Sequence, residues 1–250
     1  MTFAVRPLAL GPERQVPPTA VLSMLHFDGA NNSTTFTDAA GTLTWTRSGD
    51  AKISTAQQVF GGASGYFDGN GYYITSGSSS GLKNLLTQSF TLSGWVRPTG
   101  VGVDGMRVFS TGGGAPGWNS INGIQVLVQL IAAAPNTTLS LQLINGSRSG
   151  AVSMQSTVKV QGDAWTHIVA QCDLAKNLIG VGVNGVMTYA VRPAIGVPSY
   201  TPVAAFGTIP GEAGLSTYAF SGYMDEMRLA LGVAQYTGTT YQVPSAPYLP

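Results

Sequence analysis

Acidic residues, which carry most glycan-cleaving chemistry, are few in this chain. There are three glutamates, Glu13, Glu212 and Glu226, and none has an acidic residue two positions away. A retaining glycosidase needs two carboxyl groups about 5 Å apart, and an inverting one needs them roughly 6.5–9.5 Å apart. Asp225 and Glu226 are adjacent, so on a regular strand they point to opposite faces. The sequence therefore argues against glycan hydrolysis, although a pair assembled from distant loops stays an open alternative.

Two short glycine motifs match catalytic or nucleotide-binding patterns but lie in the wrong context. Residues 180–185 fit G-x-G-x-x-G, yet a dinucleotide site needs that motif to open a helix, and Asn184-Gly185 predicts a hairpin turn instead. Residues 77–81 fit G-x-S-x-G, but they form a Ser/Gly loop, and only His26 and His167 could act as a base. We expect neither nucleotide binding nor a serine hydrolase.

Asp225 is expected to face the core. On a regular strand it shares a face with three large side chains, those of Tyr223, Met227 and Leu229. A carboxylate that points inward must be hydrogen-bonded, paired or metal-bound. One alternative is capping by backbone N–H groups or by an arginine such as Arg97. The other is a Ca²⁺ site in which Asp28 and loop carbonyls supply further oxygen ligands. No other cofactor is indicated.

Aromatic side chains in glycine-rich loops suggest a surface on which a sugar could stack. Tyr72 and Tyr73 lie in one such loop, and Trp118 with Asn119 lies in another, residues 110–120 with the sequence STGGGAPGWNS. Aromatic side chains bury a large apolar area and, in Tyr and Trp, carry a polar tip. The alternative is that these rings pack beside the core. We take Tyr72, Tyr73, Trp118 and Asn119 as the candidate ligand-binding residues.

Alternating apolar residues indicate the elements that must position these groups. Residues 124–131, 139–144 and 179–184 alternate with period two and are rich in β-branched and leucine side chains, which is typical of strands. The 33 glycines fall mainly between such runs. A short helix is predicted near residues 81–86. Many short strands with glycine turns predict an all-β, two-sheet antiparallel jelly-roll sandwich over residues 21–250.

Residues 1–20 differ from the rest of the chain. They lack periodicity and contain four prolines, and their candidate assembly contacts are Arg6, Pro7, Pro12, Arg14, Pro17 and Pro18. Proline fixes φ and removes a hydrogen-bond donor, so this segment is expected to be an extended arm and not a central strand. Two alternatives stay open: the arm packs on its own domain, or it is held by another subunit.

Charge is scarce and balanced. Charged residues make up 9% of the chain, against roughly 25% in an average domain, and the net charge is +1. No basic patch predicts nucleic-acid binding, and no apolar run reaches the length of a membrane span. Glu226 and Arg228 are expected to form a solvated pair on the outer face of their strand. Cys172, the single cysteine, is expected to be a buried small hydrophobe.

Several motifs, in order along the chain, resemble the concanavalin A-like lectin/glucanase superfamily in its laminin-G-like branch. They are LHFDG at 25–29, FGGASGYFDG at 60–69, FTLSGWVRP at 90–98, WTHIV at 165–169, GYMDEMRL at 222–229 and VPSAP at 243–247. The resemblance covers residues 21–250 and implies two antiparallel sheets with ligands bound by loops or by a concave face. Many such relatives carry calcium, which implies the Asp28–Asp225 site. The opening and closing motifs look like those of tailed-bacteriophage virion proteins.

This resemblance, the scarcity of charge and the proline-rich arm lead to a functional expectation. We expect a non-enzymatic virion structural protein, either a capsid decoration or cement subunit or a tail-associated subunit, located in the virion and in the host cytoplasm during assembly. Its partners would be neighbouring virion proteins in an oligomeric particle, contacted through the arm and one sandwich face. The alternative is a lectin-like module that binds host-surface carbohydrate. A glycan hydrolase is the third and weakest hypothesis.

Overall fold

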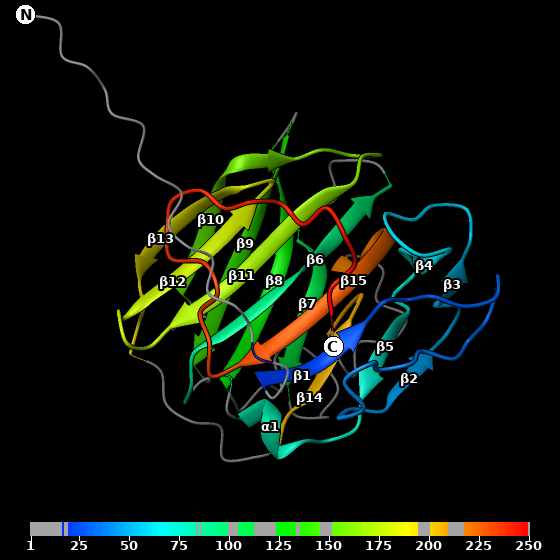
Figure 1. Ribbon diagram of the computed structural model, residues 1–250, viewed down its shortest axis with the longest axis horizontal. Helices are drawn as coiled ribbons and strands as arrows, with labels where there is room; N and C mark the ends of the chain where they lie inside the picture. The colour runs from blue at the N-terminus through cyan, green and yellow to red at the C-terminus, as the bar shows by residue number, and fades with distance from the viewer. Residues whose placement is uncertain are drawn as a thin grey trace, which may run out of the picture.

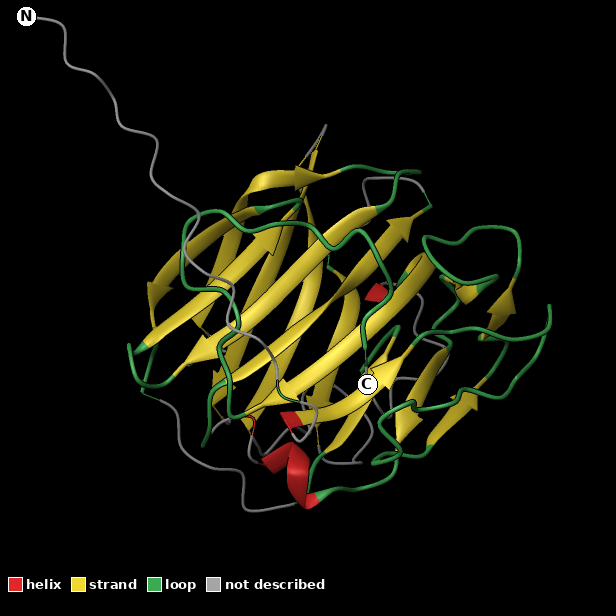
Figure 2. Cartoon of the chain, viewed as in Figure 1, coloured by secondary structure: helices red, strands yellow, loops and turns green. Residues whose placement is uncertain are grey.

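Two antiparallel β-sheets face each other in the computed structural model of the chain (Figure 1). Figure 2 shows that strands and their connecting loops make up nearly all of the described part of the chain. The structure describes residues 17, 20–83, 85, 87–99, 105–112, 124–133, 136–145, 152–194, 201–209 and 218–249. The predicted all-β sandwich is confirmed.

The first sheet has eight strands among the described residues. In spatial order they are β13 (Val186–Val191), β12 (Leu178–Val183), β11 (Thr166–Asp173), β6 (Phe90–Pro98), β15 (Ser221–Leu231), β4 (Ser64–Asp68) and β3 (Lys52–Ser54), with β1 (Val21–Leu25) also paired to β15. Every pairing between these strands is antiparallel.

The second sheet has seven strands in the part of the chain that the structure describes. In spatial order they are β10 (Val152–Val160), β9 (Asn136–Asn145), β8 (Ile124–Ala133), β7 (Met106–Gly112), β14 (Val203–Phe206), β5 (Tyr73–Ser76) and β2 (Trp45–Ser48). The short helix α1 (Ser80–Lys83) lies where the sequence predicted one, although it is only four residues long.

Local sequence explains the best-defined hairpin. β12 alternates apolar residues with glycine, and β13 pairs with it directly through Val183 and Val186. Asn184 and Gly185 join the two strands with φ angles of 44° and 91°. Positive φ at both turn positions matches the twist of the flanking strands, and asparagine and glycine tolerate it best. The hairpin predicted at this dipeptide is therefore confirmed.

The main core lies between the two sheets. Inward side chains alternate with outward ones, and the inward set is aliphatic and aromatic, with Phe67, Phe90, Phe109, Phe206 and Phe220 among the largest fully buried members. Cys172 belongs to this core and is 1% exposed, as predicted, and burial raises the pKa of its thiol to about 11. It behaves as a small hydrophobe.

A β-bulge interrupts β15 where its neighbour changes. The first part of β15 pairs with β4, and the second part pairs with β1. Opposite β6, the register shifts between Asp225 and Arg228, and Glu226 adopts a φ of 52°. The extra residue reverses which face the following side chains occupy. Met224 and Met227 therefore both reach the core, and Asp225 does not.

The C-terminal segment, residues 232–249, crosses the outer face of the first sheet (red in Figure 1). It carries three buried tyrosines, Tyr236, Tyr241 and Tyr248. His167 on β11 bonds two of them, with Nδ1 2.9 Å from the Tyr241 hydroxyl and Nε2 2.8 Å from the Tyr248 hydroxyl. Burial, with Arg228 nearby, lowers the pKa of His167 to about 3, so this side chain is neutral at physiological pH.

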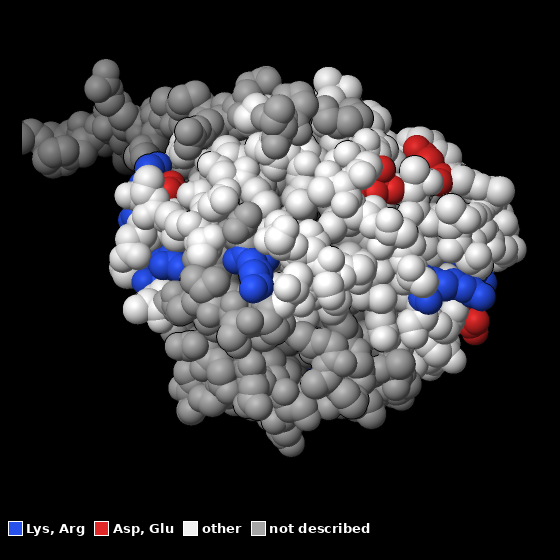
Figure 3. Space-filling view, turned by 90° about the horizontal axis from the view of Figure 1, so that it is seen from below, with Lys and Arg blue, Asp and Glu red and all other residues white. Residues whose placement is uncertain are grey.

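The surface reflects the low charge content. Figure 3 shows one face on which acidic and basic side chains form small, separate groups on a mostly uncharged surface. Large exposed hydrophobic side chains among the described residues are Val191, 70% exposed, and Leu249, 82% exposed. Across the described part of the chain, none of the helices has the length and apolar character that a membrane crossing requires.

Candidate functional site

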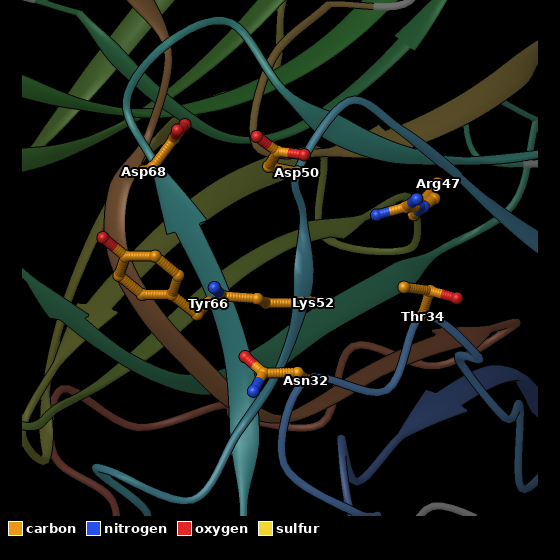
Figure 4. Close-up of a pocket in the computed structure, with 7 residues that line it drawn as sticks. All are labelled: Asn32, Thr34, Arg47, Asp50, Lys52, Tyr66 and Asp68. Atoms are coloured by element: carbon orange, nitrogen blue, oxygen red, sulfur yellow. The ribbon is translucent and has the colours of Figure 1, made fainter.

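A surface pocket of about 300 Å³ lies at the edge where the two sheets meet. It is lined by Asn32, Thr34, Arg47, Asp50, Lys52, Tyr66 and Asp68. In Figure 4 the two carboxylates lie at one end, Asn32 and Thr34 lie toward the other, and Lys52 and Tyr66 lie between them. The lining combines hydroxyl, amide, carboxylate and cationic groups with one aromatic ring.

Strand alternation positions the floor of this pocket. On β4, Phe67 points into the core, so its neighbours Tyr66 and Asp68 point outward on one face. Lys52 on β3 lies directly opposite Tyr66 in the antiparallel register, and its Nζ is 5.8 Å from the centre of the Tyr66 ring. A cation near an aromatic face is attracted by the ring quadrupole. Two neighbouring strands thus present one ring and two charged groups to solvent.

The loop before β2 closes the opposite side. Asn32 donates its backbone N–H to the carbonyl of Ile53, and the N–H of Ile53 donates to the carbonyl of Ser33, both at 2.8 Å. These bonds hold residues 32–34 against β3. Asn32 adopts a φ of 65°, a left-handed conformation that asparagine tolerates better than most residues. The loop thereby brings Asn32 and Thr34 to the pocket.

A tight turn carries Asp50 and connects the two sheets. Gly49 precedes it with a φ of 67°, and a side chain at this position would collide with the ring of Tyr72. Tyr72 therefore packs against the turn. Tyr73 lies on β5 opposite Ser48, which ends β2. Neither tyrosine is among the described residues that line the pocket: Tyr72 lies against the turn, and Tyr73 lies on the strand next to β2.

The charges of the pocket are balanced, with Arg47 and Lys52 against Asp50 and Asp68. Both oxygens of Asp68 accept hydrogen bonds from Asn70, one from its backbone N–H at 2.9 Å and one from its side-chain amide at 2.8 Å. Burial, with Tyr223 and Asp68 nearby, raises the pKa of Tyr66, so its hydroxyl stays protonated and can donate. The pocket offers donors and acceptors suited to a polyhydroxylated ligand.

Two carboxylates from separate segments therefore line an open pocket, which is the kind of pair that the sequence left open as an alternative. The argument against hydrolysis concerned acidic residues two positions apart on one strand. Asp50 and Asp68 instead come from a turn and from a neighbouring strand. A glycosidase general acid is normally kept neutral by burial in an apolar environment. Here Asp50 is exposed, and Asp68 is held as an acceptor by Asn70. Asp50 therefore lacks the apolar burial of such a general acid, and Asp68 lies beside two hydrogen-bond donors of Asn70.

The predicted metal-ligand pair has a different environment from the one expected. Asp225 Oδ2 accepts the backbone N–H groups of Val59, at 2.8 Å, and Phe60, at 3.2 Å, and Asp28 Oδ1 accepts that of Gly62, at 2.9 Å. Both carboxylates thus hold the same loop before β4. For Asp225 this matches the alternative of capping by backbone N–H groups, which the sequence left open. The expected core-facing position of Asp225 is wrong, because the bulge in β15 places its side chain on the outer face of the sheet.

The surroundings of Asp225 bear on the predicted Ca²⁺ site. Calcium takes six to eight oxygen ligands, and among the described residues no three His, Cys, Asp or Glu side chains gather into a group that could hold a metal ion. Asp225 Oδ1 is buried without a hydrogen-bond partner among the described residues. Burial raises the pKa of Asp225 to about 7 against the lowering effect of the Val59 and Phe60 N–H groups. The calcium site stays a prediction.

Glu226 and Arg228 are buried, so the expectation of a solvated pair is wrong. Glu226 is 2% exposed; its Oε1 is 2.8 Å from His26 Nδ1, and its Oε2 accepts the backbone N–H of Tyr248 at 2.8 Å. Arg228 donates to Gln235 and lies 3.9 Å from the centre of the Tyr248 ring. Both side chains fasten the C-terminal segment to the sheet.

The other predicted residues lie outside the part of the chain that the structure describes. These are Trp118 and Asn119 of the recognition loop and Arg6, Pro7, Pro12, Arg14 and Pro18 of the arm. Pro17 is described; it is exposed, and its carbonyl accepts the N–H of Ala20 at 2.8 Å. Their proposed roles stay predictions.

The pocket residues themselves were missed by sequence reasoning. One signal was present: Tyr66 and Asp68 flank Phe67 and precede a Gly69–Asn70–Gly71 turn, so they read as outward residues at a strand end. No pattern in the sequence indicated that Asn32, Arg47 and Asp50 line the pocket, because their positions depend on how three separate segments meet.

The sequence of residues 67–233 matches the concanavalin A-like lectin/glucanases superfamily. Among curated proteins, none matches the chain. Of solved structures, domain 4 of AbnA, a GH43 extracellular arabinanase from Geobacillus stearothermophilus in complex with arabinotriose, is similar with a TM-score of 0.57 and 18% identity, over 85% of this chain and 92% of that one.

The botulinum neurotoxin serotype C1 binding domain is similar with a TM-score of 0.58 and 11% identity, over 85% of this chain and 49% of that one. The binding domain of botulinum neurotoxin DC in complex with SialylT is similar with a TM-score of 0.55 and 10% identity, over 86% of this chain and 48% of that one. The chain thus spans about half the length of these toxin domains. At such identities the likeness concerns the fold, and together with the match over residues 67–233 it places this chain in the concanavalin A-like lectin/glucanase superfamily.

Proposed function

We propose that this protein is a non-catalytic carbohydrate-binding domain and that its binding site is the pocket at the sandwich edge. The observation that carries this proposal is the pocket's lining: the Tyr66 ring lies beside Lys52, Asp50 and Asp68, all reachable from solvent. Small-ligand sites use aromatic rings for contact and placed polar groups for orientation, and this pocket has one ring among six polar or charged side chains. Carboxylate, amide and cationic groups can each bond the hydroxyl groups of a sugar.

The structural relatives support this class of ligand. One similar domain was solved in complex with arabinotriose, and another in complex with SialylT. These ligands were bound by the similar proteins. For this chain we propose that the same sandwich fold, with a polar pocket on its surface, also binds a glycan.

A glycan array followed by calorimetric titration tests this proposal. Tyr66→Ala and Lys52→Ala should each weaken binding by about tenfold or more, since each removes one side of the pocket floor. Tyr218→Ala and Lys176→Ala are matched controls, because Tyr218 is also half-buried and lies outside the pocket, and Lys176 lies in the turn between β11 and β12, also outside it. Equal loss in the controls, or an array without any binding at high protein concentration, would reject the proposal.

The absence of catalysis is part of the same proposal. Its support is the exposure of Asp50 and the engagement of both Asp68 oxygens by Asn70. Incubation with each glycan that binds should release no reducing sugar. Release that disappears in both Asp50→Asn and Asp68→Asn would show that the pair is catalytic.

A structural role in a tailed-bacteriophage virion is a second proposal, compatible with the first. The low charge content favours it, because a surface with so few charges resists self-association poorly on its own. Many copies on a particle would also turn weak glycan binding into avid attachment. Mass spectrometry of purified particles should find the protein at stoichiometric copy number, and deletion of residues 1–20 should abolish incorporation without unfolding the sandwich. Complete absence from particles would reject this role.

A further inference from the structure

We infer that the binding site continues beyond the pocket as a track across four strands and that it takes a neutral oligosaccharide of several sugar units. This inference rests on the proposed carbohydrate-binding function and specifies its ligand. Its basis is a row of four residues, one from each of β3, β4, β15 and β6, which are Lys52, Tyr66, Tyr223 and Arg97.

The strand register places these four residues directly opposite one another. Lys52 pairs with Tyr66, Tyr66 pairs with Tyr223, and Tyr223 pairs with Arg97. Residues opposite each other on neighbouring strands project from the same face. Adjacent strands lie about 4.8 Å apart, so the row extends roughly 14 Å across the sheet. Lys52 and Tyr66 line the pocket, and Tyr223 and Arg97 continue the row away from it.

Contacts within the row order its side chains. The Tyr66 and Tyr223 ring centres are 5.0 Å apart, with the ring planes tilted by 46°. The Arg97 guanidinium lies 6.0 Å from the centre of the Tyr223 ring, and its Nη1 is 3.4 Å from Asp163 Oδ1. Rings and cations held this way lose little conformational freedom when a ligand binds. The row is a preorganised surface.

The row is also reachable. All four of its side chains are half-buried, and Asp163 at its far end is 65% exposed. The C-terminal segment is fastened further along the same face, at His167 and Arg228. A ligand in the pocket can therefore extend along Tyr66 and Tyr223 toward Arg97.

Charge balance identifies the class of oligosaccharide. Pocket and row together carry the cations Arg47, Lys52 and Arg97 and the anions Asp50, Asp68 and Asp163. A surface without a net charge gives neither an acidic nor a basic ligand an overall electrostatic advantage. Hydroxyl groups, by contrast, can bond to either sign. The track thus favours an uncharged chain of sugars.

The experiment measures affinity against chain length. Neutral arabino-, xylo-, cello- and malto-oligosaccharides of one to six units are titrated calorimetrically into the wild-type protein, with sialyllactose and oligogalacturonate as acidic probes. We expect one neutral series to gain about tenfold or more in affinity from one to three units and the acidic probes to bind more weakly. Tyr223→Ala should reduce trisaccharide affinity about tenfold and leave monosaccharide affinity unchanged.

Tyr223→Phe, which keeps the ring, should retain trisaccharide binding, and thermal unfolding of each variant shows whether it is folded. If Tyr223→Ala is unfolded, Arg97→Ala provides the same test at the next position. Affinity that is constant from one unit to six, or tighter binding of the acidic probes, overturns this inference and leaves the pocket's function standing. Absence of binding to every probe and to the glycan array instead overturns the proposed function itself.

Discussion

Tyr66 and Tyr223 lie directly opposite each other on β4 and β15, with their ring centres 5.0 Å apart. Their strands are brought together from positions more than 150 residues apart in the sequence, so only the folded sheet creates this pair. The arrangement places an aromatic surface next to a polar pocket. The proposed oligosaccharide track depends on the two being contiguous.

Gly49→Ala tests how the pocket's turn is held. Alanine is strained at a φ of 67°, and its side chain would also collide with Tyr72. We expect a loss of unfolding free energy of roughly 1–2 kcal/mol or more, together with weaker glycan binding through displacement of Asp50. Chemical denaturation and calorimetric titration measure the two effects.

The matched control is Gly41→Ala, which has a similar φ of 68° but no atom within 4 Å of the added side chain. It should show the backbone strain alone and bind glycan normally. Equal stability losses in the two variants would mean that the Tyr72 contact does not hold the turn.

Asp225→Asn tests the buried carboxylate. Burial raises the pKa of Asp225 from its ordinary 3.8 to about 7 in the folded protein, so the folded state holds this proton more tightly than the unfolded chain does. The stability from this group is fully present below about pH 4 and is lost as the pH rises toward 7. Asparagine stays neutral and imitates the protonated form.

The stability of Asp225→Asn relative to wild type should therefore increase by a few kcal/mol between pH 4 and pH 8. Urea denaturation of both proteins at several pH values measures this difference, and comparing the two removes the opposite trend of His167, whose pKa is lowered to about 3. Parallel pH profiles would contradict the buried, ionisable environment of Asp225.

Glu226→Gln tests the fastening of the C-terminal segment. The hydrogen bond that the His26 ring donates to the Glu226 carboxylate raises the pKa of His26 above its ordinary 6.5, with smaller contributions from the charges of Asp28 and Asp225. Stability from His26 is thus fully present below pH 6.5 and is lost as the pH rises through the folded pKa. Removing the Glu226 charge should bring the His26 pKa back toward 6.5 and shrink that slope.

Nuclear magnetic resonance titration of the imidazole signals measures this shift. His167 does not titrate in the same range, so the His26 signal is identified by its response. Asp28→Asn should move the pKa less, and hydrogen exchange at residues 233–249 should rise in Glu226→Gln. An unchanged His26 pKa in Glu226→Gln would contradict the contact.

Most of the fold could be predicted from the sequence because its signals are local. Alternation and the Asn184–Gly185 turn define the β12–β13 hairpin without tertiary information. The site could not be predicted in the same way. A single positive φ at Glu226 reverses the faces of β15, so regular-strand reasoning placed Asp225 in the core and Glu226 in solvent, and both placements were wrong.

The pocket could not be predicted from the sequence for a related reason. Arg47 belongs to an edge strand of one sheet, and Lys52 belongs to an edge strand of the other, five residues later. Which residues meet there depends on the turn at Gly49 and on the register of β3 with β4. Both are products of tertiary packing that periodicity does not encode.

Chemical-shift mapping shows where on the protein the glycan binds. Isotope-labelled wild-type protein is titrated with the best-binding trisaccharide of the four neutral series. We expect perturbations at Lys52, Tyr66, Asp68 and Tyr223, which disappear in folded Tyr66→Ala. Perturbations confined to residues elsewhere, such as 110–120, or binding that survives unchanged in Tyr66→Ala, would contradict glycan binding at this pocket.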